Sequence, residues 1–346
     1  MSSRVKDVAK LAQVSPSTVS LVLNGKSGIS EPTRARVMEA ATSLKYLQRA
    51  ARALKPSEGG TLRFLKIAKH GHTVNRDHNT FISDYIDGMS KEASGLGYRL
   101  EIVSFEESQI EKVVVSLTGA AIDGLIVLGT ELTAADIEQF QSLPVPMVVI
   151  DSFFDVLDCN FVNMNNKDAV YKIISLFVDR GFKHIGFVAS NVQTVNFRLR
   201  REAFIEGMKA FGLGFNAKDI VTVDSTFDGA YKDMLKKLQS GLEVPECYFC
   251  TNDIITYGCI KALREFNIRI PQDVSIVGFD NLPMSATMDP ALTTVDVSKR
   301  KIGSLAIRLL NELIASVEAQ PPVKILVGAA LVERDSVMPY FPFKVA

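Results

Sequence analysis

A short polar stretch, KHGHTVNRDHN at residues 69–79, holds three of the four histidines of this 346-residue chain. Imidazoles at the spacing of His70, His72 and His78 could bind a metal ion, transfer protons or hydrogen-bond a polar ligand. A zinc site needs three or four converging ligands, with Asp77 as a possible fourth, and the HxH-x5-H spacing alone does not ensure convergence. A metal site, an acid–base centre, a solvated loop and a ligand-recognition loop are therefore all open at this point.

A second candidate for metal or redox chemistry is the CxxC pair formed by Cys247 and Cys250. The stretch ECYFCTND around this pair reads as a buried strand, which directs the two side chains to opposite faces of a sheet. No second CxxC follows in the sequence. We therefore expect reduced, structural cysteines, and the sequence predicts no cofactor.

Charge divides the chain into a basic head and an acidic body. The chain has 39 basic and 39 acidic residues, yet residues 1–60 carry ten lysines and arginines against four acids, a net charge of +6. The remainder is therefore −6, which indicates that the head alone meets a polyanion. No apolar run approaches the ~20 residues that span a bilayer, and MSSRVKDVAKLAQV does not read as a secretory signal. We expect a cytoplasmic protein with no membrane partner.

The basic head reads as three short helices. Residues 4–13 place four apolar side chains on one helical stripe, and Ser15 before Pro16 is a strong start for a second helix. A third helix begins at Ser30. Two helices joined by a tight turn form a helix-turn-helix, whose second helix can enter a major groove of DNA. A small helical subdomain with a solvated basic face is the alternative.

The stretch VKDVAKLAQVSPSTVSLVLNGKSGISEPTRARVMEAATSLKY resembles the DNA-binding head of the lactose-repressor (LacI/GalR) family nearly residue for residue. The resemblance implies a helix-turn-helix domain over residues 1–46, in which the second helix reads base edges. The matching base readers are Pro16, Ser17 and Leu21. The matching phosphate-side residues are Ser15, Thr18, Ser20 and Asn24. Leu21 departs from the family's usual Arg, so it offers an apolar contact where Arg would bind guanine.

The segment LQRAARALK resembles the family's hinge helix, which pairs with its copy over the minor groove and inserts a leucine between base pairs. Leu54 is the matching leucine, and Arg49 and Arg52 suit the neighbouring phosphates. The spacing from Tyr46 is one residue shorter than usual, and the family's Pro-Asn before the helix is missing. We assign residues 47–60 to this hinge and linker, with a plain flexible linker as the alternative.

From residue 61 onward, apolar strands alternate with amphipathic helices. Two successive series of this kind predict an α/β body of two doubly wound parallel sheets, with a ligand cleft between the two lobes. The predicted strands are 62–68, 98–104, 122–129, 146–151, 183–190, 220–223, 247–252 and 274–280. The predicted helices include 80–95, 167–180, 198–211, 229–239 and 254–266.

The body continues the resemblance through RGFKHIGFVAS, RREAFIEGM, IPQDVSIVGFDN, DPALTTVDV and LVERDSV, which follow the order of the family's effector-binding core. That core is related in fold to periplasmic sugar-binding proteins, and it implies three crossings between lobes, near 161, 291 and 321. The lobes then comprise 61–160 with 292–321, and 161–291 with 322–346. The dinucleotide-binding GxGxxG, the P-loop and the GxSxG nucleophile motif are absent from the sequence.

The family's effector contacts map by position onto residues that follow strand ends. They are Asp151, Arg200, Asn252, Asp253 and Asp280. Asp and Asn can hold pairs of sugar hydroxyls, and Arg forms a fork for hydroxyls or a carboxylate. A turn or capping role for Asp280 and a surface ion pair for Arg200 are the alternatives. Ala203 and Met164 depart from the family's usual Gly and Asp, which indicates a differently tuned lobe junction.

The histidine stretch follows the first strand of the body and precedes a helix that starts near Phe81, so we expect it to roof the cleft. The family has a shorter connection here, and the resemblance therefore places the loop without assigning its contacts. We predict effector recognition by His72, Arg76, His78 and Phe81, with a metal site and a solvated loop as alternatives. The effector is expected to be a sugar, a sugar acid or a sugar phosphate, because the cationic side chains near the cleft leave room for an anionic ligand as well.

Together these patterns predict a ligand-responsive transcription repressor that binds a palindromic operator as a homodimer. We expect a small sugar or sugar derivative as effector and no enzymatic activity. A transport binding protein conflicts with the basic head and the missing secretory signal, and an enzyme would have to rest on the histidine stretch alone. Release from DNA by an inducer and binding promoted by a corepressor both remain open.

Overall fold

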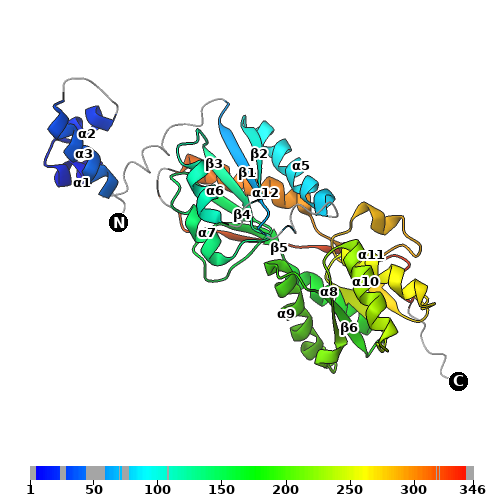
Figure 1. Ribbon diagram of the computed structural model, residues 1–346. Helices are drawn as coiled ribbons and strands as arrows, with labels where there is room; N and C mark the ends of the chain where they lie inside the picture. The colour runs from blue at the N-terminus through cyan, green and yellow to red at the C-terminus, as the bar shows by residue number, and fades with distance from the viewer. Residues whose placement is uncertain are drawn as a thin grey trace.

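The computed structural model contains three helices followed by two α/β lobes (Figure 1). It describes residues 5–23, 29–43, 59–69, 71, 78–106, 109–316, 318 and 320–339. Within these ranges, no helix is both long enough and apolar enough to cross a membrane.

The head consists of α1 (Val5–Ala12), α2 (Pro16–Leu23) and α3 (Glu31–Ser43), as the sequence predicts. Small and β-branched side chains form its core, namely Val8, Ala9, Ala12, Val19, Val22, Val37, Ala40 and Ala41. The hydroxyl of Ser15 accepts a hydrogen bond from the backbone N–H of Thr18 at 3.1 Å, which is the expected N-cap of α2. This cap fixes the start of α2 and therefore which side chains its first turn exposes.

The first lobe is built on a parallel sheet with the strand order β11-β5-β4-β3-β1-β2. Its strands are β1 (Thr61–Ile67), β2 (Arg99–Phe105), β3 (Gly124–Leu128), β4 (Met147–Ile150), β5 (Phe161–Met164) and β11 (Lys324–Val327). Helices α5 (Asn79–Gly95) and α12 (Lys299–Ala315) cover one face of this sheet. Helices α6 (Ile110–Leu117) and α7 (Ala134–Phe140) cover the other face.

The second lobe is built on a smaller parallel sheet with the strand order β7-β6-β8-β9. Its strands are β6 (Ile185–Ser190), β7 (Ile220–Val223), β8 (Cys247–Cys250) and β9 (Ser275–Val277). Helices α8 (Asn166–Asp179) and α9 (Val195–Ala210) pack on one face. Helices α10 (Phe227–Gln239) and α11 (Asp253–Glu265) pack on the other.

The two cysteines of the CxxC pair lie on opposite faces of β8, as predicted. Cys247 belongs to the hydrophobic cluster beneath α8 and α9, whereas Cys250 belongs to the cluster beneath α10 and α11. Both thiols are buried and free. They therefore act as core side chains.

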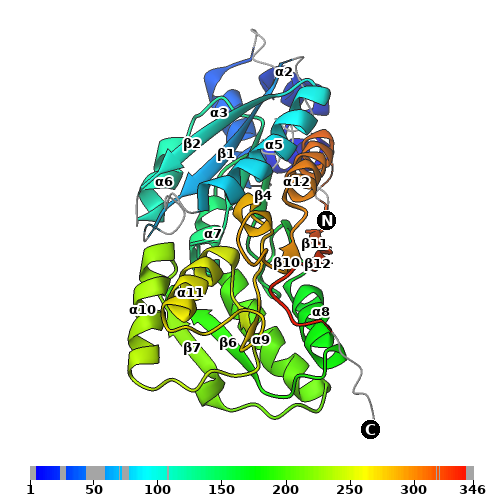
Figure 2. The same ribbon diagram turned by 90° about the vertical axis from the view of Figure 1, so that its right-hand side faces the viewer.

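The chain passes between the lobes further along than the predicted boundaries. β5 and β11 pair with each other inside the first sheet, although the sequence prediction assigns them to the second lobe. β10 (Thr294–Asp296) lies beside β9, because Asp280 N donates to Val295 O at 2.9 Å, and it pairs with β12 (Ala330–Val332). The crossings thus follow β5, β10 and β11, and Figure 2 shows β10, β11 and β12 near the junction. Each crossing therefore lies further along the chain than predicted, because the chain first completes the pairing of β5, β10 or β11.

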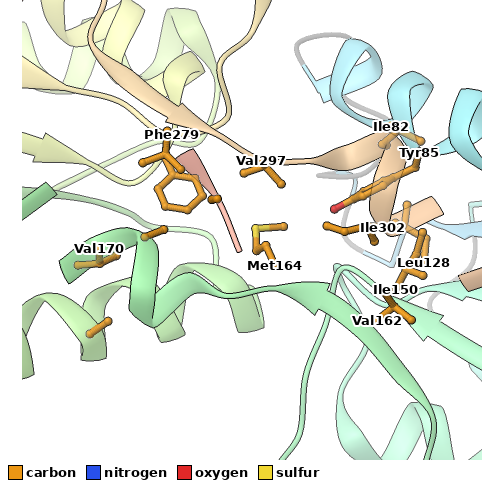
Figure 3. Close-up of a cluster of buried hydrophobic side chains, with 14 of the residues drawn as sticks. Ile82, Tyr85, Leu128, Ile150, Val162, Met164, Val170, Phe279, Val297 and Ile302 are labelled. Carbon is orange, nitrogen blue, oxygen red and sulfur yellow. The ribbon is translucent and has the colours of Figure 1, made fainter. Parts of the chain in front are cut away.

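One hydrophobic cluster continues through the junction of the two lobes. It includes Ile302 on α12, Met164 at the end of β5, and Phe279 just after β9. Figure 3 shows Met164 and Val297 between Phe279 on one side and Tyr85 and Ile302 on the other. The lobes therefore share a core beneath their polar contacts.

Candidate functional site

A cavity lies between the lobes, where the carboxyl ends of strands from both sheets face each other. It is lined by His78, Phe81, Ile82, Thr130, Asp151, Thr194, Asn196, Phe197, Arg200, Asn252 and Asp280. Its volume is about 40 Å³. That volume has room for water but is far below the ~150 Å³ of an engineered cavity that admits benzene. A sugar-sized ligand therefore requires the lobes to separate.

Asp151 lies at the end of β4 and is buried at the cavity wall. Its backbone has a left-handed φ of 58°, which a non-glycine residue adopts only where the surroundings impose it. Its carboxylate accepts hydrogen bonds from Tyr85 Oη at 2.9 Å and from Thr130 Oγ1 at 2.5 Å. Burial raises the pKa of Asp151, while these hydrogen bonds and the charge of Arg200 oppose the increase.

Asn196, in the first turn of α9, links the two lobes. Its Nδ2 donates to the backbone O and the Oδ1 of Asp151, at 3.0 and 2.9 Å. Its Oδ1 accepts from Asn163 Nδ2 at 2.8 Å and from Asn166 Nδ2 at 2.9 Å. An amide offers two donors and two acceptor lone pairs, so Asn196 uses its whole capacity. Protein groups alone thus hold the closed arrangement of the lobes.

Arg200, one turn further along α9, is a buried cation with only 2% of its surface exposed. Its Nε donates to Asn166 Oδ1 at 3.0 Å and its Nη1 to Thr251 O at 2.7 Å. The guanidinium carbon lies 3.7 Å from the ring centroid of Phe279, and Nη2 lies 3.5 Å from Asp280 Oδ1. Burial lowers the pKa of Arg200, while the charge of Asp280 opposes this decrease. The surface ion pair considered for Arg200 is therefore excluded.

Asp280 follows β9 and closes the cavity from the second lobe. Its φ is 119° and its exposed fraction is 5%, so a strained backbone carries a buried carboxyl. Burial raises the pKa of Asp280 to about 7, with Arg200 lowering it and Asp253 raising it further. The Nζ of Lys299 donates to the backbone O of Asp280 at 2.6 Å, which anchors this turn to α12. The side chain thus faces the cavity beside a guanidinium.

Asn252 and Asp253 differ in direction although they are adjacent. Asn252 lines the cavity and caps α11, because its Oδ1 accepts from Ile255 N at 3.0 Å. Asp253 does not line the cavity. Its Oδ2 accepts from Leu282 N at 2.9 Å, and its Oδ1 accepts from Thr294 Oγ1 at 2.6 Å. The carboxylate of Asp253 therefore holds the loop after β9 in place.

Part of the histidine stretch reaches the cavity. His78 directly precedes α5, is 9% exposed and lines the cavity together with Phe81. His72 and Arg76 lie outside the described residues, as does His70. Within the described part of the chain, no three His, Cys, Asp or Glu side chains are grouped as metal ligands would be.

Several cavity residues were missed by the sequence prediction. They are Ile82, Thr130, Thr194, Asn196 and Phe197. Thr130 follows β3, so the strand-end rule that found Asp151 would have found it too. Thr194 caps α9 by accepting from Phe197 N at 3.2 Å, and the helix begins at residue 195, earlier than the predicted 198. Because the predicted helix starts only at 198, the prediction omitted Thr194, Asn196 and Phe197.

The head exposes the predicted base-reading side of α2. Pro16 and Ser17 are exposed, and 42% of Leu21 is exposed although it is apolar. Ser15 is exposed and Thr18 half-buried. The side chains of Ser20, Asn24, Arg49, Arg52 and Leu54 lie outside the described part of the structure. The first turn of α2 thus presents Pro16 and Ser17 to solvent, and Leu21 adds an exposed apolar side chain one turn further along.

A helix-turn-helix head joined to a two-lobed, ligand-binding body defines a class of proteins, the ligand-responsive transcription regulators. Residues 4–48 match the bacterial regulatory proteins of the lacI family, and residues 174–337 match the periplasmic binding protein-like domain. The chain is 31% identical to the ribose operon repressor of Escherichia coli (strain K12), over 96% of this chain and 99% of that protein. It is 30% identical to the HTH-type transcriptional repressor PurR of Aliivibrio salmonicida (strain LFI1238), over 90% and 92% respectively.

The chain therefore belongs to the LacI family of bacterial regulatory proteins; it is a DNA-binding transcription regulator and not an enzyme. Solved structures confirm the predicted fold. The transcriptional regulator CelR in complex with cellobiose has a TM-score of 0.70 at 22% identity, covering 97% of this chain and 100% of that chain. The Lac repressor dimer bound to operator and the anti-inducer ONPF has a TM-score of 0.70 at 23% identity, covering 98% and 100%.

Proposed function

We propose that this protein is a repressor that binds a palindromic operator as a homodimer and is switched by a small sugar or sugar derivative between the lobes. The observation that carries the proposal is the buried set of Asp151, Arg200 and Asp280 at the cavity. Two carboxyl groups and a guanidinium can bind several hydroxyls, or a hydroxyl and an acidic group. Relatives named as a ribose operon repressor and a cellobiose complex support a sugar as effector.

Effector binding would change how the lobes are held together. The cavity of about 40 Å³ is closed by Asn196, which bonds to Asp151 across the lobes. A ligand that takes over the carboxylate of Asp151 would replace that contact and change the lobe angle. Coupling between effector and operator is reciprocal, so each changes the affinity for the other by the same factor. The sign of the coupling decides between inducer and corepressor.

A homodimer is supported by the symmetry that a palindromic operator demands. The apolar face of α12 is a weak candidate for the dimer contact. Its residues Ile302, Ala306 and Leu310 are buried within the first lobe, against the sheet and α5. A DNA-binding regulator acts where the chromosome is, which supports a cytoplasmic location. A Lac repressor dimer among the similar structures supports the pairing of two copies.

A selection of operator sequences tests the DNA-binding part of the proposal. We expect binding to a palindromic duplex, with a steep salt dependence of about −0.9 in log–log slope for each phosphate neutralised. Binding of a single half-site with equal affinity, or affinity independent of salt, would contradict a dimeric repressor. A thermal-shift screen of sugars, sugar acids and sugar phosphates tests the effector part, because a ligand of the native state raises its apparent stability.

Leu21 gives the selection a sharper form. Leu21→Arg should shift the preferred base at one position of each half-site toward guanine, because Arg pairs with guanine O6 and N7. The expected discrimination is about 1–3 kcal/mol for that base pair. Selection of the same consensus by the wild type and the variant would remove Leu21 from the base-reading set. Leu11→Arg, at an exposed residue of α1, provides a matched control for added charge.

A further inference from the structure

A second cavity lies in the second lobe, at the amino ends of β6 and β8 and thus at the end of the sheet away from the inter-lobe cavity. It is lined by His184, Lys218, Asp219, Val221, Gly241, Leu242, Glu243, Pro245 and Tyr248. Its volume is about 340 Å³. That volume lies within the ~300–1,000 Å³ range of small-molecule sites. The second cavity is therefore larger than the inter-lobe cavity in the same structure.

Tyr248 gives this cavity a hydrogen-bond donor. The residue is fully buried, and its hydroxyl has no hydrogen-bond partner among the residues that the structure describes. Its ring lies against Gly186 of the neighbouring strand β6, where a Cβ atom would lie 2.5 Å from the ring. Burial raises the pKa of Tyr248 well above its ordinary value, so the hydroxyl keeps its proton. Phenylalanine could fill the same space without leaving a buried polar group unpaired.

Asp219 gives the same cavity an acceptor. It is 9% exposed, its Oδ1 lies 3.1 Å from His184 Nε2, and its Oδ2 accepts from Asn216 N at 2.8 Å. A carboxylate has about four lone-pair sites, so these two contacts leave capacity for a ligand. The buried side chains of Val221 and Pro245 supply apolar walls beside the two polar groups.

The rim of the cavity carries balanced charge. Lys218 Nζ and Glu243 Oε2 lie 4.0 Å apart, and both side chains are largely exposed. Their opposite charges cancel at the opening, and the acceptor below belongs to Asp219, whose charge disfavours an anion. The combination of the Tyr248 donor, the Asp219 acceptor and the apolar walls suits a hydroxyl on a carbon frame, because a hydroxyl accepts and donates at once.

We propose that this cavity is a second small-molecule site, which binds a neutral polyol or monosaccharide through a hydroxyl placed between Tyr248 and Asp219. The hydroxyl accepts a hydrogen bond from Tyr248 Oη and donates one to an oxygen of Asp219. The carbon frame packs against Val221, Leu242 and Pro245. The site is independent of the proposed effector, because it uses no residue of the inter-lobe cavity.

Calorimetric titration of the full-length protein with glucose, ribose, myo-inositol and glycerol tests the site. Tyr248→Phe should weaken the binding of at least one of these polyols about tenfold, the effect of losing one good hydrogen bond. Tyr231→Phe is the matched control, since its hydroxyl bonds to Glu265 on the exposed surface at 2.8 Å. Leu242→Trp, which fills the cavity from its half-buried rim, should cause the same loss while leaving Tyr248 intact.

The outcomes separate the two cavities. Binding that both variants weaken and the control leaves unchanged supports the second site. Binding to the wild type that survives both Tyr248→Phe and Leu242→Trp places the ligand elsewhere and overturns the inference, while leaving the proposed effector role intact. An absence of binding by all four polyols also overturns it. Circular dichroism of each variant checks that a lost signal does not arise from misfolding.

Discussion

Asp151 and Asp280 hold corresponding places in the two lobes, yet their surroundings differ. Each lies shortly after the carboxyl end of a strand, each has positive φ and each is 5% exposed. Asp151 accepts hydrogen bonds from Tyr85, Thr130 and Asn196. Asp280 has Arg200 Nη2 at 3.5 Å, and its Oδ1 accepts no hydrogen bond from any described residue. Asp151 therefore belongs to the contact that closes the lobes, whereas Asp280 keeps acceptor capacity for a ligand.

Removing Arg200, the cation whose charge acts on both Asp151 and Asp280, should have the largest effect on stability. Arg200→Met leaves the carboxyl groups of Asp151 and Asp280 buried without their counter-charge. Loss of one partner from a buried ion pair typically costs about 3–5 kcal/mol of unfolding free energy. Urea denaturation of the full-length protein measures this change. The double variant Arg200→Met with Asp280→Asn should recover part of the loss, and no recovery would mean that Arg200 acts through packing on Phe279 instead.

Replacing Asp151 tests the closing contact itself. Asp151→Asn keeps the shape of the side chain but weakens the bonds from Tyr85 and Thr130, which donate to a charged acceptor. We expect a loss of about 2 kcal/mol in unfolding free energy, within the range for hydrogen bonds to charged groups. Asp289→Asn, at a carboxylate whose side chain is 99% exposed, is the control for loss of a charge. An unchanged urea midpoint for Asp151→Asn would show that the contact does not hold the lobes closed.

Replacing Asp280 should have an effect of opposite sign, which appears as a change in the pH dependence of stability. The pKa of Asp280 is about 7 in the folded protein and 3.8 in the absence of its environment, so the folded state binds more protons between these values. Stability therefore falls as pH rises from about 4 to about 7, by at most ~1.4 kcal/mol per pH unit for one proton. Asp280→Asn should reduce this slope. Urea midpoints measured from about pH 5 to pH 8 check the difference between variant and wild type.

A slope that is equal in the wild type and in Asp280→Asn would assign the pH dependence to another group. Asp253, whose pKa burial raises to about 6, contributes with the same sign and remains in the variant. In the variant, a residual slope from Asp253 is therefore expected below about pH 6, smaller than in the wild type because the contribution of Asp280 is lost there too, and the slope between pH 6 and pH 7 should disappear. The loss of slope between pH 6 and pH 7 therefore distinguishes Asp280 from Asp253.

Much of the fold was readable in the sequence, because strand periodicity and helix signals are local. The N-cap at Ser15 and the opposite faces of Cys247 and Cys250 follow from neighbouring residues alone, and both are confirmed. The sheet membership of β5 and β11 was wrong. A four-residue buried strand carries no signal for the sheet it joins, and the pairing of 161–164 with 324–327 is set by distant parts of the chain.

The site was predicted less completely than the fold. The rule that polar residues after strand ends face the cleft found Asp151 and Asp280 and would also have found Thr130. Asn196 was out of reach, because its role depends on Asp151 and Asn163 from other elements rather than on its own neighbours. Asp253 stands one residue from a cavity-lining Asn252, yet a helix start turns its side chain toward the loop after β9. Sequence adjacency does not determine side-chain direction.

The late position of β11 has a consequence for the order in which the molecule can be built during translation. β11 (Lys324–Val327) is the last strand of a sheet whose first strand begins at Thr61, and α12 between them covers one face of that sheet. A ribosome must therefore synthesise nearly the whole chain before the first lobe can complete its sheet. The three-helix head has its own core, which among the described residues is formed by side chains between Val8 and Ala41. A nascent chain thus carries a finished head while its body is still incomplete, and an arrested or prematurely terminated chain would leave a head without its regulatory body.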